Sequence, residues 1–235
     1  MTLFPELSRR TRILICVALG IAVLALILLY AISEKKSDIQ LHLAKSLIQF
    51  LVILLLGAFV ADVVKRIDKQ RRDDEQLATF RNDIRKRLDD CYQLAKKCRS
   101  QLRGAGITPE GCDCPANMSE DCQTAYREQM EQINEVQLDL EKIWHEIDSF
   151  RHAFSEADNI IRRVQLMSGF LRKLVNEYEA NWCLLGSPAD AIKAPKFKQL
   201  PHMVGPSTEG WFKEKFCDRY SEAVDFIRRD SLRAN

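Results

Sequence analysis

Three cysteines form the cluster of this chain that comes nearest to a metal-ligand pattern. Cys112, Cys114 and Cys122 lie in the stretch GCDCPANMSEDC. A Cys-x-Cys pair with one further cysteine lacks the paired spacing of structural zinc sites. Two interpretations follow, an incomplete metal-ligand set or ordinary thiols at the tip of a helical turn, and we predict no metal site.

Histidines provide the other candidate chemistry. His145 and His152 lie seven residues apart, beside Glu146 and Arg151, on a charged face of a predicted helix. Two such histidines are typical of solvated side chains rather than of ligands or bases. The sequence also has no glycine-rich phosphate loop, His-Glu-x-x-His motif or nucleophile elbow. We therefore predict no catalytic residue, no cofactor and no enzyme activity.

The elements that carry these residues follow two apolar runs, from Ile13 to Ile32 and from Ser46 to Ala61. About 20 apolar residues are needed for a helix to cross ~30 Å of hydrocarbon. We predict transmembrane helices over 13–32 and over 43–64, where Lys45 can reach the interface. The alternative is a hairpin of two core helices in a soluble protein, which would seldom lack a polar side for so long.

Basic residues predict how this hairpin is oriented. Arg9, Arg10 and Arg12 precede the first run, and the stretch KRIDKQRR, residues 65–72, follows the second. Because cytoplasmic flanks carry the excess of Lys and Arg, both termini are expected in the cytoplasm. Only residues near 33–42 would be external, which leaves too little chain for an external receptor domain.

Small side chains suggest where the two membrane helices meet. They comprise Ala18, Ala22 and Ala25 on the first helix and Gly57 and Ala61 on the second. Small residues allow close helix approach in lipid. Gln49 is the strongly polar residue within the apolar runs, and its amide would serve as helix–helix contact or, alternatively, line a pore.

A heptad pattern dominates the rest of the chain. Apolar residues recur every seven positions from Tyr126 to Leu185, which predicts helices packed through a seam. The seam residues at its centre are Ile133, Leu140, Ile147, Phe154 and Ile161. The apolar stripe widens toward its end, as suits a bundle of three or more helices.

The predicted fold is therefore an all-α membrane protein, a transmembrane hairpin followed by a cytoplasmic coiled coil or helical bundle. A continuous helix over 118–185 would be ~100 Å long and would return into the bilayer, so we expect a bend or break near 152–158. The predicted segments are an N-terminal cytoplasmic segment at 1–12, the hairpin at 13–64, a helical stalk at 65–103, a turn at 104–117, the heptad helix at 118–185, a Pro-rich linker at 186–206 and an amphipathic helix at 207–231. This last helix is expected to pack on the bundle or, alternatively, to dock to a partner.

Charge limits the partners. The chain has 35 Lys and Arg and 33 Asp and Glu, of which residues 1–62 hold six and four. Residues 63–235 therefore hold 29 of each kind and carry no net charge. Direct binding to nucleic acid is therefore not expected. The basic run at 65–72 is expected to touch anionic lipid, with RNA or DNA as the alternative. The lipid bilayer and further copies of the chain are the predicted partners.

A two-helix membrane anchor followed by a cytoplasmic helical module resembles the small two-transmembrane effectors of bacterial antiphage systems, those that accompany retron reverse transcriptases or cyclic-nucleotide signalling operons. The resemblance covers the order of parts and no motif. It implies a bacterial inner-membrane toxin, restrained by a regulatory protein or nucleoprotein, that assembles through its coiled coil and disrupts the membrane in abortive infection. The rival hypothesis is a membrane-tethered scaffold or adaptor without membrane-damaging activity; a sensor is disfavoured by the short external loop.

Overall fold

The computed structural model describes residues 20, 38–108, 119–185, 197–205 and 210–233. These residues form helices and contain no β-strand, so the prediction of an all-α fold is confirmed. The elements are α2 (Asp38–Gly104), α3 (Glu120–Ser149), the 3-10 turn η2 (Arg151–Ala153), α4 (Ala157–Leu185), α6 (Leu200–Val204), the π-helical η3 (Lys213–Cys217) and α7 (Asp218–Arg233).

The chain divides into two units, Met1–Asp74 and Glu75–Asn235. The described part of the first unit is the N-terminal portion of α2, together with Gly20. The predicted membrane helix over 13–32 otherwise lies outside the described residues, whereas the one over 43–64 falls within α2. Across the described residues, no helix is both long enough and apolar enough to cross a membrane.

Two boundaries of the predicted segments need correction. The external loop predicted over 33–42 is helical from Asp38 onward, because α2 begins there. The linker predicted over 186–206 contains α6, while its residues 186–196 lie outside the described part. Pro201 is compatible with this short helix because it stands in the first turn, where a missing backbone N–H costs no hydrogen bond.

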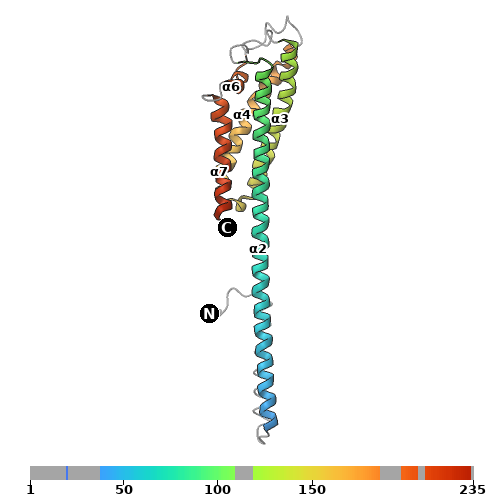
Figure 1. The fold of residues 1–235 in the computed structure, drawn as a ribbon, viewed down its shortest axis with the longest axis vertical. Helices are drawn as coiled ribbons and strands as arrows, with labels where there is room; N and C mark the ends of the chain where they lie inside the picture. Colours follow the sequence, from blue (N-terminus) through green and yellow to red (C-terminus); the bar gives the residue numbers. More distant parts are fainter. Residues whose placement is uncertain (1–19, 21–37, 109–118, 186–196, 206–209, 234–235) are drawn as a thin grey trace. The chain divides into compact units, whose positions relative to one another are not determined.

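The second unit is an antiparallel bundle, which in the described residues consists of the α2 portion from Glu75 onward, α3, α4 and α7 (Figure 1). The direction of α3 against α2 follows from two contacts. Arg87 bonds to Glu146 at 2.5 Å, and Cys98, later in α2, bonds to Gln132, earlier in α3, at 3.6 Å. The two helices therefore run in opposite directions.

Contacts of α7 close the ring of helices. Tyr220 of α7 bonds to Asp89 of α2 at 2.5 Å, and the Arg163 guanidinium of α4 lies 2.7 Å from Glu222. α7 thus packs against both α2 and α4, and the pattern of neighbours is that of an up-down-up-down bundle. Of the two roles expected for the C-terminal amphipathic helix, packing on the bundle is the one found in the structure.

The heptad stretch over 118–185, for which the sequence predicts a bend or break near 152–158, holds α3 and α4 with a reversal between Ser149 and Ala157. α3 begins after Ser119, whose hydroxyl accepts a hydrogen bond from the backbone N–H of Cys122 at 3.3 Å. It ends at Phe150, where φ is −119° and ψ is 42°. Arg81 of α2 donates to the Ala153 carbonyl at 2.6 Å and thereby satisfies a backbone acceptor in the reversal.

Candidate functional site: a closed helix seam and an exposed apolar segment

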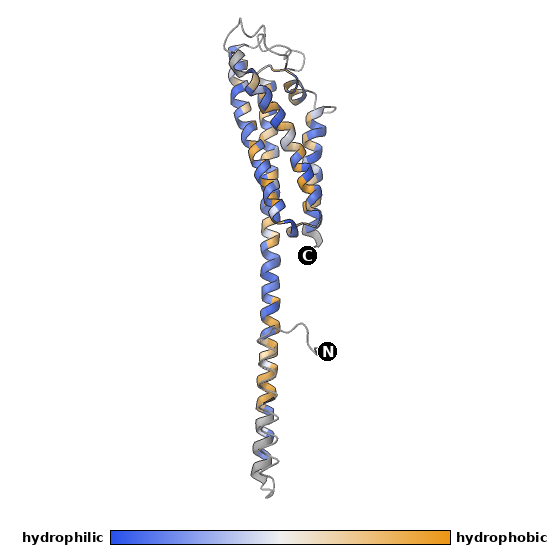
Figure 2. Cartoon of the chain, turned by 180° about the vertical axis from the view of Figure 1, so that it is seen from behind, coloured by the Kyte–Doolittle hydropathy of each residue, from blue (hydrophilic) through white to orange (hydrophobic). Residues whose placement is uncertain are grey.

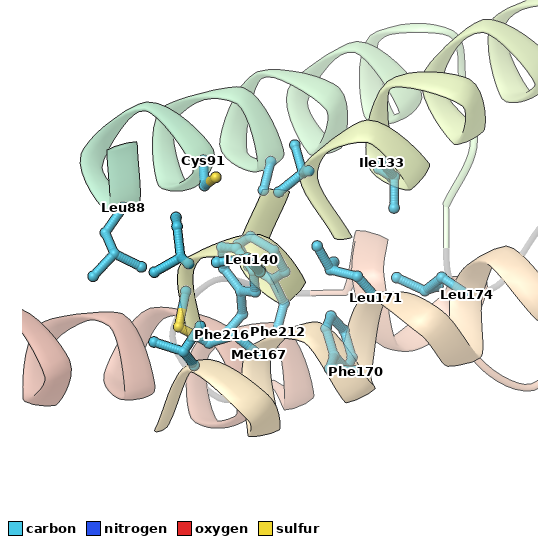
Figure 3. Packing of buried hydrophobic residues seen from close by; sticks show 14 of the residues in the cluster. Leu88, Cys91, Ile133, Leu140, Met167, Phe170, Leu171, Leu174, Phe212 and Phe216 are labelled. Atoms are coloured by element: carbon cyan, nitrogen blue, oxygen red, sulfur yellow. The ribbon is translucent and has the colours of Figure 1, made fainter. Parts of the chain in front are cut away.

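The predicted seam residues are buried inside the bundle of a single chain. Their exposed fractions are 0% for Ile133, Leu140 and Ile147, 5% for Phe154 and 7% for Ile161. Figure 3 shows Ile133 and Leu140 facing Leu171, Met167 and Phe216 from other helices of the same chain. The seam is therefore covered by the chain's own helices and is not displayed for a second copy.

The α2 helix provides the opposite wall of this core. Six of its side chains, spaced three or four residues apart, are 6% exposed or less: Ile84, Leu88, Cys91, Ala95, Cys98 and Leu102. Phe212 and Phe216, just before α7, fill the space against them (Figure 3). Burial of one such side chain contributes about 1.5–3 kcal/mol, so this face is a major source of the bundle's stability.

A buried carboxylate joins α7 to the start of α4. Asp230 is 4% exposed and accepts hydrogen bonds from the backbone N–H of Ser155, at 3.0 Å, and from the Ser155 hydroxyl. A buried carboxylate costs free energy unless donors surround it. The two donors from one residue offset that cost and fix the reversal between η2 and α4.

Polar side chains also hold both ends of α6. The Glu177 carboxylate of α4 accepts from the backbone N–H groups of Lys198, Gln199 and Leu200, at 2.5 to 2.9 Å. At the other end, Arg99 donates to the Met203 carbonyl at 2.8 Å and to the Gly205 carbonyl. α6 therefore lies across the bundle end as a strap between α4 and α2.

An aromatic stack joins α2 to α7. The rings of Tyr92 and Tyr220 lie 4.0 Å apart and nearly parallel, and the Tyr220 hydroxyl donates to Asp89. Burial is the largest cause that raises the pKa of Tyr220, and the hydrogen bond to Asp89 is the next. The phenol is thus held in its neutral, donating form.

Cys91 and Cys98 of α2 are buried in the core of the bundle. Burial raises the pKa of Cys91 to about 12 and that of Cys98 to about 11, so neither supplies a thiolate at neutral pH. Cys122 is half-buried and its thiol donates to the Ala105 carbonyl at 2.9 Å. Cys112 and Cys114 lie outside the described residues.

No group of three or more His, Cys, Asp or Glu suited to a metal ion occurs in the described ranges. His145 and His152 are both exposed, and their nearest ring contacts are to Trp144 and Phe150. A small cleft between α2 and α3, of about 180 Å³, is lined by Arg87, Asp90 and Asp139 among others. Arg87 is ion-paired with Glu146, and Asp139 with Lys142.

Comparisons with protein-family models, with curated proteins and with solved structures find no match to this chain. Its candidate site must therefore be judged from its own residues.

The apolar segment of α2 contrasts with the closed core. Ten large apolar side chains between Phe50 and Ile67 are 37% to 67% exposed, and Figure 2 shows this apolar stretch. They are Phe50, Val52, Ile53, Leu54, Leu56, Phe59, Val60, Val63, Val64 and Ile67. Their positions occupy every side of the helix, so the segment lacks a polar face.

The predicted membrane-packing residues of this segment are also exposed. Gln49 and Ala61 face outward, and a Cβ atom added at Gly57 would meet nothing within 4 Å. Among the described residues, no partner group lies against Gly57. Ala18, Ala22 and Ala25, predicted to face them, lie outside the described residues.

Sequence reasoning did not identify the polar residues that close the bundle. Asp230, Glu177 and Arg99 each bond to residues more than 20 positions away. A charged residue on the apolar side of a predicted amphipathic helix, as Asp230 is beside Ile227, is the signal that could have indicated a buried partner.

Proposed function

We propose that this chain is a membrane-tethered helical module, with residues 13–32 and 43–64 as the anchor and residues 75–235 as a cytoplasmic adaptor domain. The observation that carries the proposal is the set of ten exposed apolar side chains between Phe50 and Ile67. Monomeric soluble proteins seldom expose a contiguous apolar surface of this extent. A lipid environment would remove that surface from water.

Charge next to the segment supports the same proposal. Residues 46–61 carry no charged side chain, whereas Lys65, Arg66, Lys69, Arg71 and Arg72 follow within three turns. Arg66 is ion-paired with Asp62 at 3.1 Å, which lowers the cost of that carboxylate near an interface. The order apolar, then basic, is typical of a helix that leaves a membrane on its cytoplasmic side.

The closed seam favours an adaptor over an effector that assembles through its coiled coil. Ile133, Leu140 and Ile147 are fully covered within one chain, so assembly through them would first require the bundle to open. The surface that remains for partners is the outside of the bundle.

A membrane-disrupting effector of an antiviral defence is the second candidate, and one observation favours it. Gly57 has open space around it and Ala61 is exposed one turn later. Such a pair permits close approach of a helix from another copy. On this hypothesis, the membrane helices and not the seam would assemble.

Extraction of the full-length chain from bacterial membranes tests the anchor. Wild-type protein is expected in the membrane fraction after alkaline carbonate treatment, and Ile53→Lys with Leu56→Lys should release most of it. Each lysine at mid-helix opposes insertion by about 3 kcal/mol. The matched control is Leu138→Lys with Leu166→Lys, two comparably exposed leucines of the bundle, which should leave the distribution unchanged. Wild-type protein in the soluble fraction would refute the anchor.

Membrane potential separates the two candidates. An adaptor leaves the potential of an expressing cell intact. An effector dissipates it before growth stops, and Gly57→Leu with Ala61→Leu should then restore the potential without releasing the protein from the membrane.

A further inference from the structure

One stretch of α2 is strongly basic although residues 63–235 carry no net charge. From Tyr92 to Gly104 the sequence YQLAKKCRSQLRG contains four Lys or Arg and no Asp or Glu. Tyr92, Lys96, Arg99 and Arg103 are separated by four, three and four residues, so they share one face of the helix. Charge is therefore concentrated on one face at this end of α2.

This face meets the segment that precedes α7. The Tyr92 ring lies 6.4 Å from that of Phe216, and the Arg99 guanidinium lies 5.1 Å from the Phe212 ring. The same segment adds Lys213 and Lys215. Figure 1 shows α6 and the start of α7 beside this part of α2. Residues 92–103 and 211–215, far apart in the sequence, thus build one surface.

We call this surface the basic face and define it by Lys96, Arg99, Arg103, Trp211, Lys213 and Lys215. Its acidic content is small: Glu214 is bonded to Lys215 at 2.5 Å. Within the described residues, Lys96 and Arg103 have no carboxylate within ion-pairing distance. Two charges of the basic face therefore remain uncompensated by described residues.

The pKa values of neighbouring groups reflect the positive charge of the basic face. Burial is the main cause that lowers the pKa of Arg99, and the charge of Arg103 lowers it further. Burial raises the pKa of the Cys217 thiol, a hydrogen bond from Tyr92 and the charges of Lys96 and Arg99 lower it, and Asp218 raises it. Lys96, Arg99 and Arg103 thus lie within electrostatic reach of the same small region.

An exposed aromatic stack lies on the basic face. Trp211 is 44% exposed, whereas its neighbours Phe212 and Phe216 are 3% and 0% exposed. The indole lies 4.1 Å from the His202 ring with the planes 7° apart, and the Lys215 ammonium lies 5.8 Å from the indole centroid. Trp211 is therefore an exposed ring beside a cation, with His202 stacked on one of its faces.

We propose that the basic face binds single-stranded nucleic acid, with phosphates bound by Lys96, Arg103 and Lys213 and a base stacked against Trp211. Basic side chains that follow the backbone, combined with an aromatic platform, are the recurring means of binding single strands. The carboxylate side chains of an acidic polypeptide would use the cations but have no ring to stack on Trp211. This inference goes beyond membrane tethering, and it replaces the expectation of no nucleic-acid binding, which rested on a charge averaged over the whole region.

Binding of a fluorescein-labelled 20-mer of oligothymidylate to the full-length chain in detergent micelles tests the proposal. Fluorescence anisotropy should show saturable binding that weakens with salt, because released counterions drive it. Lys96→Glu with Arg103→Glu should weaken binding at least about tenfold. The slope of log K against log salt concentration should become smaller in magnitude by about 1.4, at ~0.7 for each of the two phosphates that are no longer neutralised. Lys142→Glu with Lys173→Glu, two exposed lysines elsewhere on the bundle, is the matched control and should change affinity less than about twofold.

Trp211 variants separate stacking from charge. Trp211→Ala should weaken binding about fivefold or more, and Trp211→Phe should retain most of the affinity. Equal weakening by the Lys142/Lys173 control would overturn the proposal. So would displacement of the oligonucleotide by polyglutamate at the same charge concentration, since that result would indicate a surface for acidic polypeptides.

Discussion

Two stretches of α2 have similar apolar residues and opposite surroundings. Between residues 84 and 102, six apolar side chains that recur every three or four positions are 6% exposed or less. Between residues 50 and 67, they occupy nearly every position and most are about half exposed. The spacing of the apolar residues, more than their hydrophobicity, determines whether a helix buries one face against protein or needs a surrounding apolar phase.

The largest effect is expected from a charge placed on the buried side of the bundle. Leu140→Asp should destabilise it by about 3 kcal/mol or more, because the carboxylate would have no partner in a fully apolar environment. Urea denaturation followed by circular dichroism measures this loss. Leu138→Asp, at a site that is 45% exposed, is the control and should change stability by less than about 0.5 kcal/mol. Equal effects of the two substitutions would show that Leu140 is not buried in a seam.

A smaller effect is expected at the polar link between α4 and α7. Asp230→Ala removes the acceptor for the Ser155 backbone N–H and hydroxyl, and leaving a buried donor unsatisfied costs about 1–3 kcal/mol. The rate of amide hydrogen exchange should increase more at residues 154–160 than in α3. Asp230→Asn retains one acceptor oxygen and should lose less stability. A uniform change across the bundle would argue against a local role.

The smallest effect concerns the Tyr220 hydroxyl. Tyr220→Phe should cost about 1 kcal/mol at pH 7, the net value of one hydrogen bond. Because the folded-state pKa of Tyr220 is raised above its usual 10, its contribution is fully present below pH 10 and is lost as the pH rises further. The wild type should therefore lose more stability between pH 9.5 and 11 than the Phe variant does. Parallel pH profiles for the two proteins would contradict this assignment.

Local patterns predicted much of the bundle. The heptad positions from Ile133 to Ile161 indicated which side chains face inward, and the length of the repeat indicated a break between α3 and α4. The partners of that face could not be predicted, since a seven-residue period defines a stripe on a helix and not the helix that covers it. A stripe suited to assembly between chains is equally suited to a bundle within one chain.

The polar contacts of the bundle were beyond sequence reasoning for a different reason. Asp230 and Ser155 are 75 positions apart, and neither lies in a motif. The basic face likewise depends on residues far apart in the sequence. Neither residues 92–103 nor residues 211–215 form a motif, and the two segments come together only where α2 packs against Phe212 and Phe216. Net charge over a whole region therefore concealed a local concentration.

The contact between Arg99 and the Met203 carbonyl joins residues 104 positions apart, and that between Tyr220 and Asp89 joins residues 131 apart. During translation, the apolar side of α2 therefore leaves the ribosome long before α7, the bundle helix made last, can cover it. In the interval part of this side is exposed apolar surface, which is prone to aggregation and is the kind of surface that chaperones protect. A chain that ends before residue 218 would keep the part of that surface which α7 covers exposed to water, and it would be prone to aggregation.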